Sequence, residues 1–305
     1  MELPERTHIY QNHHLDSTRW DRYVTRADDI VIATPYKSGT TWMQHIVHSL
    51  LFPENRDPFP SGISPWLDIR VPNLDELIDN LEAQTHRRFI KTHLPLDGLT
   101  FYENVKYIVV SRDVRDVFMS LWNHYSSYAP RAYDSFNNTP GRTGGPQPHC
   151  PDDIREFWKM WITRGWFQWE TEGYPFWSNM RHVQTWWNYK DLPNILFVHY
   201  NNLKQDTESE IMRIAQYLEI EIPKGSMQNI LTMVSLDTMR RNAVEKERDE
   251  EGEPFMKGGA RSFFYKGTNS RWRDVLTAED LLLYDEAAQR ELSADCHRWL
   301  EQGVI

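Results

Sequence analysis

Short apolar runs recur along the chain, and they have the pattern of buried strands. The clearest, residues 30–34, is short, unbroken and rich in β-branched side chains, as expected for a strand covered on both faces. Further strands are predicted at residues 88–92, 105–111 and 195–199. Segments with helical character alternate with these runs, which indicates a parallel sheet with helices on both of its faces.

Helical periodicity is clearest in residues 74–85, where apolar side chains recur on one face. Those side chains are Leu74, Leu77, Ile78 and Leu81. The other predicted helices span residues 41–51, 115–125, 153–169, 180–189, 208–218 and 278–301. A capping box from Thr277 to Asp280 is expected to begin the last of them, which can be one helix or two.

Two long segments between these elements are predicted to be loops. Residues 129–151 are rich in Pro, Gly, Asn and Ser, and residues 244–262 are charged and rich in Gly. Long loops in compact domains often form lids or binding loops. We expect the first segment to serve in that way and the second to be mobile.

The pattern predicts a single α/β domain over residues 1–305, with a core from about residue 28 to residue 302. A central parallel sheet flanked by helices resembles the fold of the P-loop nucleoside-triphosphate hydrolases. Ligands bind such sheets beyond the carboxyl ends of the strands. We therefore expect the loops at residues 34–41, 91–95 and 111–114, and the strand end near Tyr200, to surround one crevice.

Charge and composition exclude several kinds of partner. The net charge of −10 argues against general binding to nucleic acid, so an anionic ligand would need a local island of basic groups. The two cysteines, Cys150 and Cys296, have no metal-site spacing and suit a reducing compartment. The sequence shows no apolar leader and no segment of membrane-spanning length. We expect a soluble, cytoplasmic protein with no membrane partner.

The loop after the first strand, Lys37-Ser38-Gly39-Thr40-Thr41, suits an anion. Gly39 permits a tight turn, and backbone N–H groups at the start of a helix bind negative charge. Thr40 and Thr41 add hydroxyl donors, and Lys37 adds a point charge. The alternative is an ordinary turn with a capping threonine. The loop lacks the first glycine of the G-x-x-x-x-G-K-[ST] pattern, which argues against a nucleoside triphosphatase.

A histidine and a lysine follow the second strand, in the segment KTHLP. His93 is expected to face the same crevice as Lys37, beside Lys91. Neighbouring positive charge disfavours the imidazolium ion, so a neutral His93 could act as a general base. The alternative is a structural role, which most of the twelve histidines must have.

The third strand leads into the segment RDVRDVFMS. Arg112 leaves the strand end and can bind a phosphate through two N–H groups. Ser120 can face the crevice if the following helix forms. Arg115, Asp113 and Asp116 are interpreted as surface ion pairs, with Asp113 a weak candidate for a Mg²⁺ ligand.

In this order and spacing, the segments TPYKSGTTW, KTHLP and RDVRDVFMSLWNHY resemble those of the cytosolic-type sulfotransferases. These enzymes use 3′-phosphoadenosine 5′-phosphosulfate (PAPS), and the resemblance covers about residues 30 to 277. It implies that loop 37–42 holds the 5′-phosphosulfate and that His93 is the catalytic base. The other implied contacts are Trp42 and Tyr200 to the adenine, and Arg112 and Ser120 to the 3′-phosphate.

A segment near the C-terminus resembles the family's R-K-G-x-x-G-D-W motif, whose Arg, Lys and Gly complete the 3′-phosphate site. Here it comprises Phe264, Tyr265, Lys266 and Gly267, followed by Trp272. Tyr265 stands where the family has Arg, so one basic contact to the 3′-phosphate is expected to be lost.

Other departures concern the same end of the ligand. Ser270-Arg271 replaces the motif's Gly-Asp, and the candidates to restore the lost contact are Arg261, Arg271 and Arg273. Leu236 stands where the family has a Phe that stacks on the adenine. The family's K-x-x-x-T-V-x-x-x-E dimer segment is not recognisable in residues 240–265, so the oligomeric state stays open.

The residues also suggest a mechanism, because sulfuryl transfer resembles phosphoryl transfer in line between two oxygens. His93 would take the acceptor's hydroxyl proton, Lys37 would neutralise or protonate the leaving oxygen, and Lys91 would brace the equatorial oxygens. The resemblance further implies that Ser38 restrains Lys37 until the acceptor binds. No metal is expected, since side chains supply the positive charge.

Two alternatives remain at this stage: a P-loop kinase or nucleoside triphosphatase, and a non-catalytic module that binds PAP, the product 3′-phosphoadenosine 5′-phosphate. The acceptor is expected to be a small alcohol or phenol, apolar or aromatic. Its pocket would involve segments 52–72, 129–151 and 244–262. The candidate lining side chains are Phe59, Trp66, Tyr128 and Tyr133, which could equally be packing beneath loops.

Overall fold

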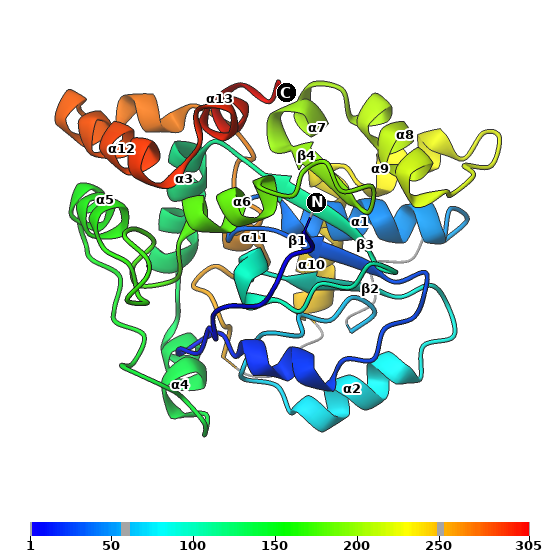
Figure 1. Ribbon diagram of the computed structural model, residues 1–305, viewed down its shortest axis with the longest axis horizontal. Helices are drawn as coiled ribbons and strands as arrows, with labels where there is room; N and C mark the ends of the chain where they lie inside the picture. Colours follow the sequence, from blue (N-terminus) through cyan, green and yellow to red (C-terminus); the bar gives the residue numbers. More distant parts are fainter. Residues whose placement is uncertain (1, 56–61, 249–252, 305) are drawn as a thin grey trace.

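The computed structural model describes residues 2–55, 62–248 and 253–304. Its centre is a parallel sheet with strand order β2-β1-β3-β4 (Figure 1). The strands are β1 (Ile30–Ala33), β2 (Phe89–Thr92), β3 (Lys106–Ser111) and β4 (Ile195–His199). All pairings are parallel, and all four strands lie where the apolar runs predict them.

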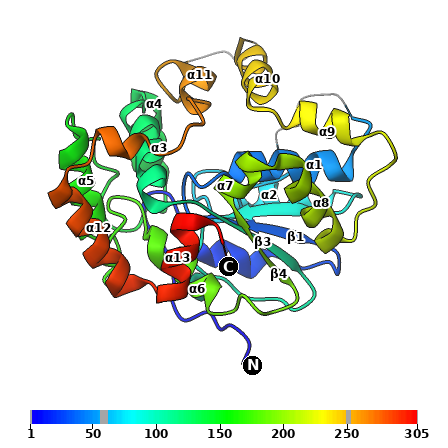
Figure 2. The same cartoon turned by 90° about the horizontal axis from the view of Figure 1, so that it is seen from above.

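Helices cover both faces of the sheet. Alternate strand side chains enter two separate hydrophobic clusters, one on each face, and helices complete each cluster. Ile30 and Ile32 belong to one cluster, and Val31 and Ala33 belong to the other. The first face packs against α1 (Thr40–Leu51), α8 (Thr207–Leu218) and α9 (Met227–Met233). The second packs against α3 (Val114–Ser126), α5 (Ile154–Thr163), α6 (Asn179–Trp187), α12 (Ala278–Glu291) and α13 (Ala294–Gln302). Figure 2 shows the two groups on opposite sides, which confirms the predicted α/β class.

Several helix boundaries differ from the predictions. The helix expected over 153–169 ends at Thr163, and the last predicted helix is two, α12 and α13. The amphipathic segment forms α2 (Leu74–Glu82), and the Thr277 capping box begins α12 as predicted. Helices α7 (Tyr200–Gln205) and α9 were not anticipated, nor were 3-10 helices at Ser17–Arg22, Leu96–Gly98 and Arg271–Asp274. Among the described residues, no helix combines the length and apolar character needed to cross a membrane.

Both predicted loops contain helices, so those predictions are wrong in part. Residues 129–151 include α4 (Pro130–Asn138), which starts with a proline in the first turn, where its missing N–H costs nothing. Residues 244–262 include the end of α10 (Leu236–Arg248) and α11 (Gly259–Phe263). Residues 253–258 form no helix, as the loop prediction has it, and residues 249–252 lie outside the described residues.

These helices form a cap on one side of the molecule. Ala129 N–H donates to the Phe255 carbonyl (3.1 Å), and Lys257 N–H donates to the Ser127 carbonyl (2.6 Å). The segment before α11 is thereby tied to the turn between α3 and α4. Figure 2 shows α4, α10 and α11 on the same side of the fold. This cap contributes apolar side chains, among them Phe136, Phe255 and Phe263, to the cavity described next.

Candidate active site

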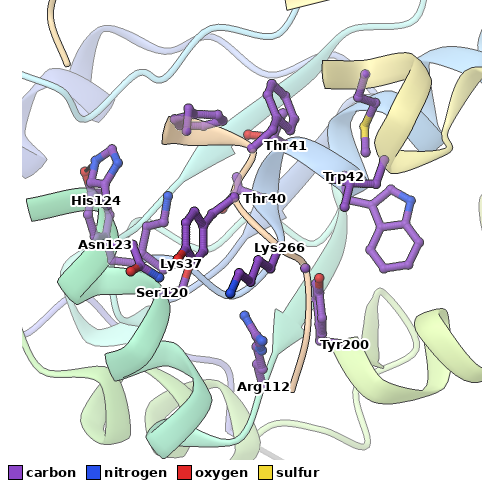
Figure 3. Close-up of a pocket in the computed structure, with 18 of the residues that line it drawn as sticks. Lys37, Thr40, Thr41, Trp42, Arg112, Ser120, Asn123, His124, Tyr200 and Lys266 are labelled. Carbon is purple, nitrogen blue, oxygen red and sulfur yellow. Dashed lines mark hydrogen bonds between the residues drawn. The ribbon is translucent and has the colours of Figure 1, made fainter. Parts of the chain in front are cut away.

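A cavity of about 620 Å³ lies beyond the carboxyl ends of the strands, within the range of ligand pockets. The segments after all four strands contribute to its lining, through Lys37, His93, Arg112 and Tyr200. This is the convergence that the parallel topology predicts. Figure 3 shows Tyr200 with Trp42 on one side of the cavity and His124 on the other.

The lining is strongly basic although the chain is acidic. No Asp or Glu is among the described residues that line the cavity. Its cations are Lys37, Lys91, Arg112, Lys204, Lys266 and Arg271. In a protein of net charge −10, such an island favours a ligand with several negative charges.

The loop after β1 presents an anion site at the start of α1. Lys37 and Gly39 both have positive φ, 65° and 110°. A Cβ on Gly39 would lie only 2.9 Å from Cδ2 of Tyr200, so glycine is needed for conformation and for close approach. The lining includes Thr40, Thr41 and Trp42. Backbone N–H groups of this first turn can therefore bind an anion in the cavity.

Ser38 differs from its neighbours in this loop. Its side chain is fully buried, and it is not part of the cavity lining. Its hydroxyl has no hydrogen-bond partner among the described residues.

His93 is held in one tautomer by the end of β1. The register pairs Ala33 with Thr92, which brings Thr34 beside His93. Nδ1 of His93 lies 2.8 Å from the Thr34 carbonyl and 3.1 Å from the Thr34 hydroxyl. The shorter contact is to a group that can only accept, which favours the proton on Nδ1 and the lone pair on Nε2. The His93 backbone N–H donates to the Asp68 carboxylate (3.1 Å).

Burial keeps the His93 imidazole neutral. It lowers the pKa of His93 to about 3, with help from the charges of Lys91 and Lys37. The neighbouring charges were expected to be the cause, whereas burial is the larger effect. The side chain is only 4% exposed, yet it lines the cavity. A neutral imidazole in this position can accept a proton from a bound hydroxyl.

The positive charges of Lys37 and Lys91, the two lysines beside His93, have no salt-bridge partner among the described residues. Burial, with repulsion from Lys91 and Arg112, lowers the pKa of Lys37 to about 7. Burial lowers the pKa of Lys91 to about 8, although Asp68 opposes the shift. Their ammonium groups contact rings, with Lys37 Nζ 4.6 Å from the Phe263 centroid and Lys91 Nζ 5.0 Å from that of Trp66. An anionic ligand would stabilise both charged forms.

Arg112 is fixed at the end of β3 by neutral partners. Its Nη2 donates to Asn269 Oδ1 (2.6 Å) and to the Thr268 carbonyl (3.2 Å). Its guanidinium lies 4.3 Å from the centroid of the Tyr200 ring, and its Nε is buried without a partner. Ser120, on α3, joins it in the lining. No carboxylate within salt-bridge distance neutralises Arg112 in the described part of the chain.

The neighbouring charges were misinterpreted as surface ion pairs. Asp113 and Asp116 are buried, and Asp113 accepts from Arg115 (2.6 Å) while capping α3. Arg115 also pairs with Glu301 (2.8 Å). Asp116 instead accepts the backbone N–H of Ser270 (2.7 Å). Asp113 is outside the cavity lining, so its geometry does not support a role as a ligand of Mg²⁺ there.

The C-terminal segment closes the Tyr200 end of the cavity. Tyr265, Lys266 and Gly267 line it, as does Leu236 at the start of α10. Arg240 donates to the carbonyls of Phe264 and Tyr265, which fixes this extended stretch. The residues that the family motif suggested are therefore gathered around the same space.

Other lining residues were not predicted, although a signal existed for two of them. His124 follows Ser120 by four residues on α3, and Lys204 follows Tyr200 by four on α7. Side chains four apart share a helix face, so they could have been inferred. No pattern marks Asp68, which orders the site by accepting from His93 N–H and Trp66 Nε1 (2.7 Å).

Part of the cavity wall is apolar and aromatic. It includes Tyr36, Trp66, Ile69, Phe136, Phe255, Met256 and Phe263. Of the predicted acceptor-pocket residues, only Trp66 lines the cavity in the described part of the chain, with its ring centroid 4.7 Å from that of His93. Tyr128 lies behind Tyr36 (3.3 Å between hydroxyl oxygens), and Tyr133 packs on His149. Phe59 lies outside the described residues.

No three His, Cys, Asp or Glu side chains in residues 2–55, 62–248 and 253–304 stand close enough to hold a metal ion together.

Comparisons with known proteins give consistent results. A family model described as the sulfotransferase domain matches residues 27–296. A glycolipid sulfotransferase of Mycobacterium bovis is 30% identical over 97% of this chain and 94% of its own length. Sulfotransferase 1B1 of Canis lupus familiaris is 29% identical over 90% of this chain and 86% of its own length. The crystal structure of mouse sulfotransferase SULT7A1 complexed with PAP has a similar fold, with a TM-score of 0.68, 21% identity and coverage of 94% and 93% of the two chains.

Proposed function

Because the chain belongs to the sulfotransferase domain family, we propose that it transfers a sulfuryl group from PAPS to the hydroxyl of a small alcohol or phenol. The products would be PAP and a sulfate ester. One observation carries this proposal: a neutral His93 lines the cavity together with Lys37 and Lys91, and the described lining has no carboxylate to neutralise the two lysines. That arrangement suits an anionic sulfuryl donor bound beside the lysines and an acceptor hydroxyl bound beside His93.

The cationic side chains and backbone N–H groups of the cavity suit the negative charges of PAPS. The first turn of α1, with Lys37 and Lys91, would hold the phosphosulfate. The 3′-phosphate would bind Arg112, Ser120 and Lys266 at the other end of the basic lining. Trp42 and Tyr200 offer aromatic surface for the adenine, with ring centroids 5.5 Å apart in an edge-to-face arrangement.

In the proposed reaction three side chains have separate roles. Nε2 of His93 takes the proton of the acceptor hydroxyl while the acceptor oxygen forms its bond to sulfur. The bond between sulfur and the bridging phosphate oxygen breaks, and that oxygen keeps the electron pair. Lys37 neutralises or protonates the leaving oxygen, and Lys91 stabilises the equatorial sulfuryl oxygens.

The acceptor would lie against the aromatic wall between Trp66 and Phe263. Aromatic and apolar side chains favour an apolar or aromatic molecule with one reactive hydroxyl. The similar mycobacterial protein is described as a glycolipid sulfotransferase, which is compatible with an apolar group beside a hydroxyl.

One assay separates this function from the two alternatives. The protein is incubated with labelled PAPS and a panel of hydroxyl acceptors, with and without EDTA, and the series is repeated with ATP. We expect transfer from PAPS that resists EDTA and none from ATP. Transfer from ATP would indicate a kinase, and PAP binding without transfer to any acceptor would indicate a binding module. Absence of PAPS binding in calorimetry would overturn the proposal.

Binding of PAP at pH 8 is expected to take up about one proton. Lys37 and Lys91 have pKa values of about 7 and about 8 in the protein, and PAP raises both. The contribution of Lys37 to PAP affinity is therefore greatest below pH 7. It weakens as the pH rises above 7, because a neutral Lys37 must be protonated before it can bind the anion.

Calorimetry in two buffers of different ionisation enthalpy measures this uptake. At pH 8 the phosphate groups of PAP are already ionised, since their second pKa is near 6, so the protein is the source of the signal. Lys37→Met should reduce the uptake. An unchanged heat between the buffers would contradict the assignment of the two lysines.

Arg112→Ala is expected to weaken PAP binding by about 1.5–3 kcal/mol, the range for a hydrogen bond to a charged group. The guanidinium has no carboxylate partner among the described residues, so its loss removes a contact to the ligand more than an internal ion pair. Arg22→Ala, a partly exposed residue outside the cavity lining, is the control. Equal PAP affinity in wild type, Arg112→Ala and Arg22→Ala would refute the assignment to the 3′-phosphate.

A further inference from the structure

Arg271 reaches the cavity because the chain makes an unusual turn just before it. Ser270 has a positive φ of 65°, and its N–H is held by the Asp116 carboxylate. A 3-10 helix, Arg271–Asp274, begins at the next residue. This conformation is uncommon for a residue with a side chain, and the bond to Asp116 stabilises it. That bond therefore fixes the turn that places Arg271 in the lining.

The Arg271 guanidinium has neutral partners only. Its Nη2 donates to the Met119 carbonyl (3.3 Å), directly before Ser120 in the chain. Its Nε is buried without a partner, and its guanidinium lies 5.2 Å from the centroid of the Tyr265 ring. No carboxylate among the described residues forms a salt bridge with it. Both guanidinium groups line the same cavity. Burial and repulsion from Arg112 lower the pKa of Arg271, and the charge of Asp116 opposes that shift.

The two other candidates to replace the missing arginine are excluded by position. Arg261 is exposed on α11 and is not part of the lining. Arg273 is exposed as well, and its guanidinium stacks on Trp272 (4.8 Å to the ring centroid). The charge of the buried Asp116, which accepts from the Ser270 N–H, partly offsets those of Arg112 and the half-buried Arg271. Because no carboxylate among the described residues forms a salt bridge with either guanidinium, a bound anion would stabilise both.

We propose that Arg271, together with Arg112 and Ser120, binds the 3′-phosphate of the nucleotide and supplies the guanidinium that Tyr265 cannot. Tyr265 then has a different role, since its ring supports the Arg271 side chain through a cation–π contact. The proposal rests on the proposed function, because the phosphate in question belongs to PAPS and PAP.

The test compares PAP with adenosine 5′-monophosphate, which lacks the 3′-phosphate. Calorimetry on the full chain measures both ligands with wild type, Arg271→Ala, Arg271→Gln and Arg273→Ala. We expect Arg271→Ala to weaken PAP binding by roughly 10- to 150-fold and to change binding of the monophosphate little. Arg271→Gln keeps a donor for the Met119 carbonyl but has no charge, so it should show the same selective loss. Arg273→Ala should bind both ligands like wild type.

The outcomes distinguish failure of the inference from failure of the proposed function. If wild type binds PAP more tightly than the monophosphate, and both Arg271 variants retain that preference, Arg271 does not bind the 3′-phosphate and the inference is wrong. Equal weakening of both ligands in both variants would point to a structural role and overturn it too. Failure of wild type to bind PAP would overturn the proposed function itself.

Discussion

Replacing His93 with alanine is expected to lower the rate of sulfuryl transfer by roughly 10²–10⁴-fold while PAP affinity stays close to that of wild type. The contact with the Thr34 carbonyl favours the proton on Nδ1, which leaves the Nε2 lone pair for the proposed role as base. Burial keeps the imidazole neutral, so the base is available at ordinary pH without prior loss of a proton. The product PAP has no hydroxyl to deprotonate at this position, so its binding should not depend on the imidazole.

Single-turnover rates with PAPS and an acceptor, together with calorimetry of PAP, measure the two quantities. His93→Gln is a useful second variant, because it retains a polar group but cannot accept the proton. The matched control is His86→Ala, since His86 precedes β2 whereas His93 follows it, at the opposite end of the same strand. Turnover near the wild-type rate in both His93 variants would mean that another group is the base.

The sequence predicts the sheet and the convergence of the site because both depend on local patterns. Apolar runs locate the strands, and parallel topology then brings Lys37, His93 and Arg112 to one edge. The family resemblance is confirmed. Its first three motifs lie in or beside the segments that follow β1, β2 and β3. Predictions of this kind need no knowledge of distant contacts.

The predictions that failed concern residues whose environment is set by distant parts of the chain. Asp113 and Arg115 resemble an exposed charge cluster in the sequence, but Asp113 is buried and Glu301, far along the chain, also pairs with Arg115. Asp116 likewise accepts from the N–H of Ser270, a residue far from it in the sequence. No local pattern reveals such partners, so a run of alternating charges is easily assigned to the surface.

The helices of the cap were predicted to be loops because of the amino-acid composition of their segments. Residues 129–151 contain enough Pro, Gly and Asn to resemble a loop, yet the first of these prolines begins α4. Helices α4 and α11 are short, and short helices depend on tertiary packing more than on intrinsic propensity. Their stabilising contacts include Ala129 with Phe255, which are far apart in the sequence.

Replacing Lys37 with methionine is expected to lower kcat by roughly 10²–10³-fold at saturating PAPS, the effect of removing one group that stabilises developing charge. Lys37 lies in the loop that precedes α1, where the bridging oxygen of a phosphosulfate would bind. As the bond to sulfur breaks, that oxygen gains negative charge. It becomes part of a phosphate monoester with a second pKa near 6. An anionic ligand stabilises the charged form of Lys37, whose pKa is about 7 in the protein alone, so its ammonium group can neutralise that oxygen or give it a proton.

The comparison with Arg112→Ala makes this prediction specific. Loss of Arg112 should weaken PAP binding and leave kcat at saturation close to wild type, because a contact to the 3′-phosphate is equal before and during the reaction. Loss of Lys37 should act mainly on kcat, because its contact strengthens as charge develops. Lys224→Met, at an exposed site outside the lining, controls for loss of a positive charge. If Lys37→Met raised only the KM for PAPS, Lys37 would serve in binding and the leaving oxygen would depend on another donor.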